Sequence, residues 1–445
     1  MELHLIPLDQ EQGDRYILYR PLLRLAFIGN RSMARLALRY GNSPPAAEEL
    51  QGQDALQFLD QIGFFEPDPP SPKIQTSLSH TILLLTNRSQ IRCSYGYPAA
   101  GEALPQRLSF ATGKAAIDRV HEQAVKANRA EYRIDFHGGG EPTIEWETLQ
   151  ELVQYARNKP VRAKISVTSN GIWSEAQARW LMDNLDSLSI SMDGSPDTQD
   201  KQRPLRDQLP SSPIVMRNLQ RLDEYGYKYG IRMTACFPWT QLKEDVQYIV
   251  ENTLCRSIQV EPAFNTQRDG HRLPNQEQAN AFIQAFTDAF EVAKHSQASL
   301  AYSGARPKTI APTFCSAPFN ALVVNPEDQV VACYEIIDQY HPFADLATYG
   351  KIDGNEIILD PISQARFRAL SDERFSTCRD CFCHWTCAGD CFARAFAEGP
   401  NGHLYKSMRC TINREITKYL LMDLLQENGG VWRGDPSDNE IALYG

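Results

Sequence analysis

Six strand-like segments alternate with helix-like segments between residues 78 and 300, and this alternation restricts the fold more than any other feature of the sequence. Strands separated by helices pair in parallel through right-handed crossovers. The predicted fold class is therefore α/β, a partial (β/α)6 TIM-like barrel with any site at the carboxyl ends of its strands. The expected strands are Thr81–Leu85, Tyr132–Phe136, Ala163–Thr168, Ser187–Ser191, Gly230–Phe237 and Ser257–Glu261.

A proline-rich segment marks the clearest domain boundary. Prolines at 67, 69, 70 and 72 favour an extended, semi-rigid linker. The chain is therefore expected to divide into a small α+β domain (1–66), the linker (67–77), the barrel (78–300) and a cysteine-rich domain (301–445).

Arginine residues dominate the first domain. Six arginines and no acidic residue lie between positions 15 and 47. Three of them are spaced to share one face of a predicted helix: Arg31, Arg35 and Arg39. Such a stripe is either a solvated helix face or part of a groove that docks an acidic peptide by electrostatic attraction and strand addition.

The composition excludes several functional classes. A net charge of −10 and a pI near 5.5 argue against general nucleic-acid binding, because phosphates require a basic surface. No apolar run approaches the ~20 residues that a membrane helix needs, and the first residues lack the pattern of a signal peptide. We therefore expect a cytoplasmic protein without nucleic-acid or membrane partners, in a compartment where disulfides are rare.

Eight of the eleven cysteines lie between residues 315 and 410. In a reducing compartment this clustering indicates metal or iron–sulfur ligation. Thiolates suit iron–sulfur clusters and zinc equally, and spacing alone does not choose between them. A zinc ribbon is the alternative to iron–sulfur clusters, with the ligands Cys378, Cys381, Cys387 and Cys391. Cys236 and Cys255, within the barrel, are expected to be core residues.

Polar turns follow the second, third and fourth expected strands. The first turn, His137–Thr143, is glycine-rich, so a ligand can approach its backbone, and the next helix offers N–H groups to an anion. Ser169–Gly171 follows the third strand, and Ser189–Gly194 follows the fourth. Each turn alone is more often structural than functional, but their order along the chain is specific.

Together these turns resemble the GGEP, TNG and SxDG motifs of radical S-adenosylmethionine (SAM) enzymes. The resemblance implies that they bind SAM, with the GGEP backbone holding its amino group. The matching residues are Gly139, Gly140, Glu141, Pro142, Ser169, Asn170, Ser191 and Asp193. The family pattern continues through Asp200 and Arg203, with Gln199 in place of a histidine.

The loop after the first strand departs from that family. There the motif CxxxCxxC gives three thiolates to a four-iron cluster and leaves one iron free for SAM. Here the three positions hold Ser89, Cys93 and Gly96. Ser89 is a poor ligand and Gly96 has no side chain, so we predict that this cluster is absent or very labile, with Cys93 as its residual ligand. Binding of SAM is left open.

The C-terminal cysteines resemble the SPASM domain of peptide-modifying radical SAM proteins, which binds auxiliary iron–sulfur clusters. That resemblance assigns one 4Fe-4S cluster to Cys378, Cys381, Cys387 and Cys410. It assigns the other to Cys315, Cys333 and Cys391. The set for the first auxiliary cluster, Cys315, Cys333 and Cys391, lacks a fourth cysteine, so its cluster keeps an open iron, borrows a ligand or contains fewer irons. Cys383 is an extra cysteine, either that ligand or a buried free thiol.

One residue argues against a sulfatase-maturing activity. Such relatives are expected to carry an acid directly after the second cysteine of the SPASM pattern, for use as a base. Here that residue is Tyr334.

The resemblance implies a role in the modification of ribosomally made peptides. The first domain is similar in layout to the winged-helix-like recognition domain of peptide maturases. With its SAM-cleaving cluster lost, the protein is expected to be a pseudoenzyme that binds a precursor peptide with an acidic leader, or an intact radical SAM partner enzyme. The alternatives are an active enzyme whose cluster is completed by Ser89 or a partner chain, a non-catalytic adaptor with a zinc ribbon, and an ordinary enzyme in which Ser89 and Gly96 are introduced substitutions.

Overall fold

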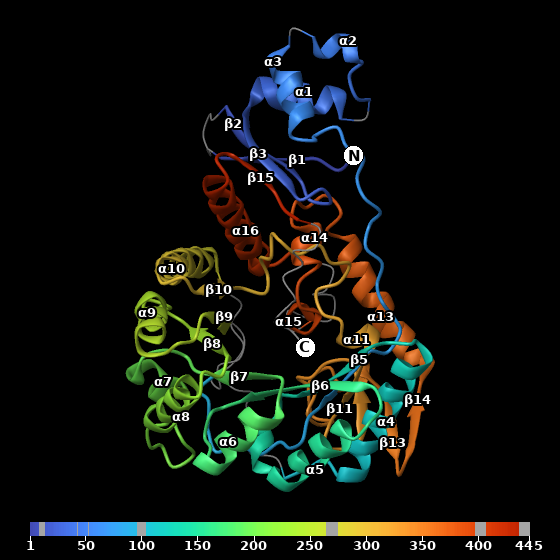
Figure 1. Cartoon of the computed structure of the whole chain (residues 1–445), viewed down its shortest axis with the longest axis vertical. Helices are drawn as coiled ribbons and strands as arrows, with labels where there is room; N and C mark the ends of the chain where they lie inside the picture. The colour runs from blue at the N-terminus through green and yellow to red at the C-terminus, as the bar shows by residue number, and fades with distance from the viewer. Residues whose placement is uncertain are drawn as a thin grey trace.

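The computed structural model describes residues 1–8, 14–41, 43–51, 53–95, 104–263, 275–396 and 406–435. Within these residues the chain forms an eleven-stranded sheet and a separate four-stranded antiparallel sheet. Figure 1 shows the small sheet at one end of an elongated molecule and the large sheet at the other, with the C-terminal helices between them.

The large sheet has the order β10-β9-β8-β7-β6-β5-β4-β11-β12-β13-β14. Every neighbouring pair from β10 to β11 is parallel, and the pairs from β11 to β14 are antiparallel. The strands are β4 (His80–Leu83), β5 (Glu131–Phe136), β6 (Arg162–Ser169), β7 (Ser187–Ser191), β8 (Gly230–Cys236), β9 (Ser257–Ala263), β10 (Ser299–Ala301), β11 (Ala321–Val324), β12 (Gln329–Val331), β13 (Thr348–Asp353) and β14 (Glu356–Leu359).

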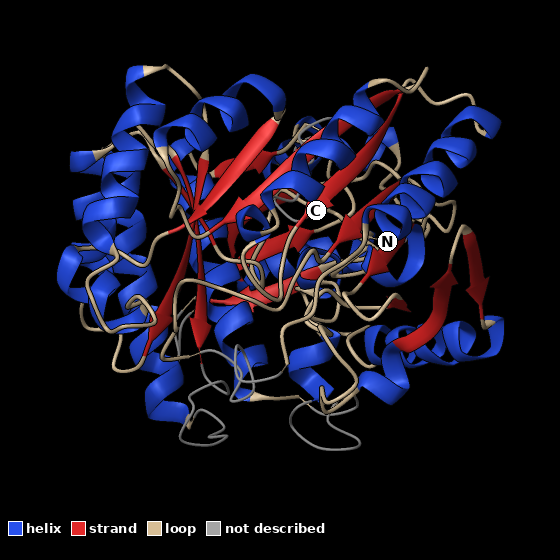
Figure 2. Cartoon of the chain, turned by 90° about the horizontal axis from the view of Figure 1, so that it is seen from below, coloured by secondary structure: helices blue, strands red, loops and turns tan. Residues whose placement is uncertain are grey.

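Helices between the parallel strands cover the outer face of this sheet (Figure 2). Helix α5 shows why, because its four buried residues, Leu149, Leu152, Val153 and Ala156, fall on one face and join the apolar core. These elements are α4 (Phe110–Lys126), η1 (Pro142–Ile144), α5 (Trp146–Arg157), α6 (Glu175–Asn184), α7 (Pro196–Gln202), α8 (Ser212–Glu224), α9 (Leu242–Asn252) and α10 (Gln276–His295). The predicted α/β partial barrel is confirmed.

The inner, concave face of the sheet is polar. Along β6 and β8 residues alternate between buried and half-buried or exposed positions, as a period of two requires. The strand register places the polar side chains side by side: Ser166 lies opposite Asp135, and Arg232 lies opposite Ser191 and Gln259. The barrel therefore encloses a hydrophilic interior.

The N-terminal sheet has the order β1-β2-β3-β15, so a strand from the C-terminal part of the chain completes it. Asn30 caps α1 by accepting a hydrogen bond from the Met33 N–H (2.9 Å), as N-cap asparagines do. The elements of this domain are β1 (His4–Pro7), β2 (Arg15–Arg20), β3 (Leu25–Asn30), β15 (Val431–Arg433), α1 (Arg31–Tyr40), α2 (Ala47–Leu50) and α3 (Asp54–Gln61).

Both faces of the small sheet are buried. One face packs Leu18, Leu25 and Phe27 against α1 and α3. The opposite face packs against α16 and the cysteine-rich region, with Tyr19 and Trp432 in that core. The sheet is therefore fixed to the rest of the molecule by apolar contacts.

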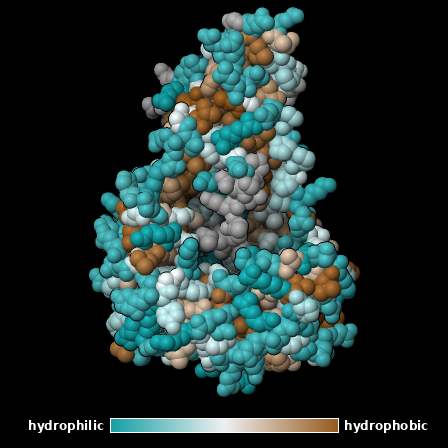
Figure 3. Space-filling model, in the orientation of Figure 1, coloured by the Kyte–Doolittle hydropathy of each residue, from teal (hydrophilic) through white to brown (hydrophobic). Residues whose placement is uncertain are grey.

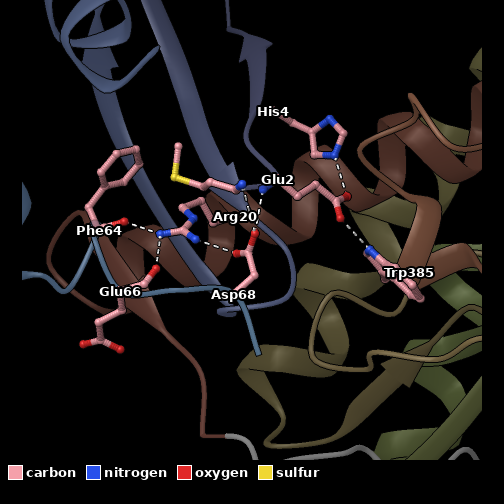
Figure 4. Close-up of polar contacts among 8 residues, drawn as sticks. Glu2, His4, Arg20, Phe64, Glu66, Asp68 and Trp385 are labelled. Atoms are coloured by element: carbon pink, nitrogen blue, oxygen red, sulfur yellow. Dashed lines mark hydrogen bonds and ion pairs between the residues drawn. The ribbon is translucent and has the colours of Figure 1, made fainter. Parts of the chain in front are cut away.

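Polar contacts reinforce this junction (Figure 4). The Arg20 guanidinium donates to the Glu66 carbonyl (2.9 Å) and pairs with Asp68 (2.5 Å), which binds the linker to the first domain. The Trp385 indole donates to the Glu2 carboxylate (2.8 Å), which connects the first domain to the cysteine-rich region.

The C-terminal region continues the large sheet rather than starting a new one, since β11 pairs in parallel with β4. Its helices are α11 (Ala317–Asn320), α12 (Ala344–Ala347), α13 (Pro361–Ser376), α14 (His384–Cys387), α15 (Phe392–Phe396) and α16 (Met408–Glu427). On the face drawn in Figure 3, hydrophilic residues cover most of the barrel surface. In the described parts of the chain, no helix has the length and apolar character needed to cross a bilayer.

Candidate functional site

The side chain of Glu141 ties two of the predicted SAM-binding turns together. It is 2% exposed. One carboxylate oxygen accepts hydrogen bonds from the hydroxyls of Thr143 and Ser169 (both 2.7 Å), and the other accepts from the Asn170 N–H (2.6 Å). Burial raises the pKa of Glu141 although these donors favour its charged form. Glu141 therefore fixes the relative positions of the turns after β5 and β6.

The glycine turn, residues 137–143, lies against the loop that follows β4. We call the described residues 86–95 of this loop the cluster loop. Gly138 and Gly139 have positive φ angles of 72° and 71°, which glycine adopts without strain. A Cβ at Gly140 would overlap the backbone of Arg88, and the Glu141 N–H donates to the Arg88 carbonyl (2.7 Å). Pro142 is buried at the start of η1. The first and second strand-end motifs are thus in direct backbone contact.

Further hydrogen bonds hold the cluster loop in place. The Asn170 side chain donates to the Gln90 side chain (3.0 Å), joining this loop to the turn after β6. The N–H groups of Arg92 and Ser94 donate to carbonyls of residues 204 and 202 (2.9 and 2.8 Å). These hydrogen bonds connect the loop after β4 to the turn after β6 and to residues 202–204.

The turn after β7 forms the fourth part of the site. Asp193 is 2% exposed, and its carboxylate accepts from the Tyr95 hydroxyl and the Thr234 N–H (both 2.9 Å). Arg203 also donates to the Tyr95 oxygen. Burial raises the pKa of Asp193 to about 6, against the opposing charge of Arg203. Ser191, at the end of β7, is half-buried.

Gln199 connects the turn after β7 to the start of α8. Gln199 is fully buried; its amide oxygen accepts from the Asp193 N–H (2.9 Å) and its NH2 donates to Ser211 (3.1 Å). Asp200 accepts from the N–H and hydroxyl of Ser212 (both 2.7 Å), which fixes the start of α8.

The residues present do not fit a four-iron cluster at the first loop. The Ser89 hydroxyl accepts the Ile91 N–H (3.1 Å), so it closes a local turn. Cys93 is half-buried, and its charge contributes to the raised pKa of Arg203 although burial opposes that rise. Gly96, the third position, lies outside the described residues. One thiol remains where three are needed.

The cysteines assigned to the first auxiliary cluster come from three separate segments of the C-terminal region. Burial raises the pKa of Cys333 well above its usual range, and the thiols of Cys391 and Cys315 add to this rise. The Glu335 carboxylate contributes to it as well. Cys333 is therefore the member of this set whose pKa responds to both other thiols and to the Glu335 carboxylate.

In the set assigned to the second auxiliary cluster, electrostatic effects link Cys387 to Cys410 and Cys410 to Cys378. Burial raises the pKa of Cys387, and the charge of Cys410 adds to the effect; Cys378 acts on Cys410 in the same way. A hydrogen bond with the buried Cys383 thiol lowers the pKa of Cys381. Within the described ranges, no three His, Cys, Asp or Glu side chains are arranged to hold a metal ion. The donor chemistry of both sets nevertheless fits iron or zinc, because each supplies three or more thiols.

The two barrel cysteines differ. Cys255 is 2% exposed and its thiol lies 3.3 Å from the Ser257 carbonyl, so it is a core residue as expected. Cys236 is half-buried and lines a cavity of about 580 Å³ with Asp193 and Thr234. For Cys236 the core prediction is wrong, because it is the last residue of β8 and takes the strand's half-buried, inward-facing alternation.

Several residues that contribute hydrogen bonds or packing contacts to the site were not identified from the sequence. Tyr95, Gln90 and Thr234 have no distinctive local pattern, and their roles depend on contacts from other strands. Tyr334 packs against His137 (ring centroids 4.6 Å apart), whose Nε2 lies 2.9 Å from Arg232. Of these residues, only His137 could have been singled out from the sequence, because it begins the glycine turn.

No family model matches the chain. Fe-coproporphyrin III synthase of Methanosarcina barkeri is 32% identical over 151 residues, which are 34% of this chain and 35% of that protein. An uncharacterised protein of Methanocaldococcus jannaschii is 26% identical over 179 residues, which are 39% of this chain and 59% of that protein. The chain thus matches about a third and three-fifths of these two relatives.

Solved structures match more of the chain. The structure of anSMEcpe with bound AdoMet has a TM-score of 0.61 at 15% identity and covers 79% of this chain and 95% of its own. Streptococcus suis SuiB bound to the precursor peptide SuiA has a TM-score of 0.53 at 13% identity and covers 83% of this chain and 82% of its own. The protein therefore has the fold of the radical SAM partial barrel.

Proposed function

We propose that the protein is a radical SAM/SPASM-type protein of peptide modification that has lost its SAM-cleaving cluster and acts as an iron–sulfur-binding or peptide-binding pseudoenzyme. One observation carries this proposal. The turns through Glu141, Asn170 and Asp193 retain a complete hydrogen-bond network, while the loop beside them supplies one thiol, Cys93. A pseudoenzyme of this kind would keep the turns around the site but lack the cysteines that bind the catalytic cluster.

Structural neighbours support a peptide as the ligand. SuiB was solved with the precursor peptide SuiA and anSMEcpe with the peptide Cp18Cys, and both match about four-fifths of this chain. The sequence match to Fe-coproporphyrin III synthase covers about a third of the chain. It therefore supports a substrate like that of the synthase less strongly than the structural matches support a peptide.

Iron and sulfide counting after anaerobic reconstitution tests the loss of the cluster. We expect iron only from the auxiliary sets, so Cys93→Ala should leave the count unchanged and Cys378→Ala should lower it. Cys255→Ala is the control, since its thiol belongs to neither set. SAM-dependent changes in the EPR spectrum or release of 5′-deoxyadenosine by the wild-type protein would refute the proposal.

A restoring variant sharpens this test. Ser89→Cys combined with Gly96→Cys rebuilds the CxxxCxxC motif after β4. The double variant should gain about four irons per chain and an EPR signal that SAM perturbs. An unchanged iron count would show that the loop is unsuited to a cluster for reasons besides its missing thiols.

An active enzyme with a partner-completed cluster is the second candidate. It is favoured by the intact contacts of Glu141 and Asp193, which would have no ligand to position in a pure adaptor. It predicts that SAM is cleaved only when a cognate peptide or an intact radical SAM partner enzyme is added.

Docking of an acidic leader at the first domain is a separate part of the proposal. Arg31 already pairs with Asp14 (3.4 Å), whereas Arg35 and Arg39 are exposed on the same helix. Because β15 covers the edge of β3, strand addition would use the outer edge of β1 or of β15. Arg35→Glu should weaken binding of an acidic peptide by roughly tenfold at low salt and less at high salt. Arg217→Glu on the barrel is the control, and equal effects of both variants would contradict the docking site.

A further inference from the structure

The side chain of Asn413 lies between the barrel and the cysteine set assigned to the second auxiliary cluster. Asn413 is on α16, three residues after Cys410, and is 1% exposed. Its Nδ2 donates to the sulfur of Cys387 (3.3 Å), and its Oδ1 accepts from the Tyr302 hydroxyl (2.7 Å). The amide therefore joins a barrel residue to a thiol of that set.

Contacts within the barrel fix the position of Tyr302. This residue directly follows β10 and is buried, with its ring packed against Phe282 (ring centroids 5.8 Å apart). The N–H of the next residue, Ser303, donates to the Glu261 carboxylate at β9 (3.0 Å), and Arg394 donates to the same carboxylate (2.7 Å). The tyrosine hydroxyl thus reaches Asn413 from a part of the barrel that is held on two sides.

Gly304 leaves the space that the two side chains occupy. A Cβ at this position would lie 2.1 Å from Oδ1 of Asn413 and 2.8 Å from Cε1 of Tyr302. Both distances are too short for non-bonded atoms, so any side chain at 304 would displace the amide or the ring. The close approach of the backbone at 304 therefore belongs to the same arrangement.

The orientation of the amide suits a sulfur that accepts a hydrogen bond. A tyrosine hydroxyl both donates and accepts, so it is compatible with either end of an asparagine amide. A metal-bound thiolate can only accept, whereas a free thiol also has a proton to donate. With Tyr302 donating to Oδ1, the N–H of Asn413 is directed at Cys387. This is the arrangement that a metal-bound thiolate requires.

Such a donor changes the properties of a bound metal. An N–H group that donates to a thiolate withdraws charge from the sulfur, which favours the reduced form of an iron–sulfur cluster and raises its reduction potential. Removal of a partner that orients a metal ligand typically lowers metal affinity by about 10–100-fold. The contact between Asn413 and Cys387 is buried, so water does not weaken it.

We propose that Asn413 is a positioning residue for the metal site that includes Cys387. Its N–H stabilises Cys387 as a metal-bound thiolate, and the Tyr302 hydroxyl keeps the amide in the orientation that does so. This inference deepens the proposed function and rests on it for the binding of iron or zinc by this cysteine set. It adds that a barrel residue acts on the auxiliary site through one hydrogen-bonded amide.

Titration of the metal-free full chain with Co²⁺ tests the proposal under anaerobic conditions. Cys315→Ser combined with Cys333→Ser removes two thiols of the first set, so the thiolate-to-cobalt absorption of this parent reports on the second set. Asn413→Asp keeps the shape of the side chain but replaces the N–H donor by an acceptor. The affinity for Co²⁺ should fall by about 10–100-fold, and the charge-transfer band should move to lower energy because the sulfur electrons lose a stabilising donor.

Two further variants keep the test decisive if Asn413→Asp fails to fold. Tyr302→Phe removes the hydroxyl that orients the amide, and Gly304→Ala displaces the amide. Both should shift the charge-transfer band in the same direction as Asn413→Asp, by a smaller amount. Asn280→Asp, on the exposed face of α10, is the matched control and should leave the affinity and the band unchanged.

The reduction potential of the iron-reconstituted parent provides a second readout. It should fall in Asn413→Asp and Tyr302→Phe at full iron loading, whereas a residue that only supported the fold would lower the iron content without moving the potential. An unchanged band and an unchanged potential in both variants would overturn the proposal. Failure of the proposed function is distinct, because the parent itself would then bind no metal that Cys378→Ala removes.

Discussion

Two buried carboxylates, Glu141 and Asp193, hold together the turns at the carboxyl ends of the barrel strands. Glu141 accepts four hydrogen bonds from the turns around it, and Asp193 connects the cluster loop to β7 and β8. Burying a carboxylate is costly, so each must be stabilised by these donors. The contacts of both residues thus fix the positions of the strand ends around the site.

The burial of Asp193 predicts a measurable pH dependence. Its pKa of about 6 in the folded protein exceeds the ordinary value of 3.8, so the folded state holds the proton more tightly. This contribution to stability is complete below pH 3.8 and is lost as the pH rises through 6. The wild-type protein should therefore lose about 3 kcal/mol of unfolding free energy between pH 4 and pH 7 relative to Asp193→Asn. Urea unfolding at several pH values measures this difference.

Asp183→Asn provides the reference for that experiment, because this aspartate is exposed on α6. The pH dependence of the unfolding free energy of Asp183→Asn should match that of the wild-type protein. Parallel profiles for Asp193→Asn and the wild-type protein would contradict the buried, proton-binding role.

At the scale of elements, the short strand β15 has an influence beyond its length. It pairs antiparallel with β3 and inserts Trp432, which is 4% exposed, between the small sheet and α16. Arg433 donates to the Ile62 carbonyl (2.8 Å) and pairs with Glu66. The strand therefore closes one edge of the N-terminal sheet and joins that domain to the C-terminal helix.

Truncation of this anchor should loosen the first domain. Trp432→Ala removes a large buried side chain from a core shared by two domains, so we expect a loss of roughly 3–5 kcal/mol in unfolding free energy. Hydrogen exchange should show the loss of protection in β1 to β3 before the barrel strands. Arg433→Ala, which breaks an exposed ion pair, should cost less than about 1 kcal/mol. Uniform loss of protection across both sheets would refute a local role for the strand.

The elements of the barrel could be predicted because their patterns are local. The expected strand Ser187–Ser191 coincides with β7, and the expected strand Tyr132–Phe136 lies within β5. Their alternation with amphipathic helices determines the parallel order. The antiparallel strands β12 to β14 and the pairing of β15 with β3 were not predicted, since short strands are defined by distant partners.

The candidate site was predictable only in part, for the same reason. Glu141 and Asp193 follow recognisable strand ends, whereas the partners Tyr95 and Gln90 come from another segment and carry no pattern of their own. Asp328 illustrates an intermediate case. Its φ of 58° lies in the left-handed region that glycine adopts most readily, and its carboxylate accepts from the Thr112 hydroxyl (2.7 Å).

At the scale of the whole molecule, the cysteine-rich region connects the two sheets. It extends the large sheet through β11, and it packs Cys383 and Cys387 into the same core as Tyr19 of the small sheet. The second cysteine set is thus adjacent to the interface with the first domain. Metal binding there would stabilise the interface as well as the local loops.

Metal removal tests this connection. The reconstituted protein should unfold at a higher temperature than the metal-free protein, with a gain of roughly 3 kcal/mol or more in unfolding free energy. Cys410→Ser should remove much of that gain, whereas Cys236→Ser, in the barrel, should preserve it. Calorimetry with and without a chelator measures the difference. Equal unfolding temperatures in the two states would exclude a structural metal.

The path of β15 also has a consequence for synthesis. Arg433 and Glu66 meet although they are 367 residues apart in sequence. When residues 1–66 leave the ribosome, the partner of β3 has not yet been translated, and the apolar sheet face that later meets α16 has no cover. The nascent first domain must therefore stay incomplete while the barrel is made. We therefore expect the uncovered apolar face of this domain to bind chaperones during that interval.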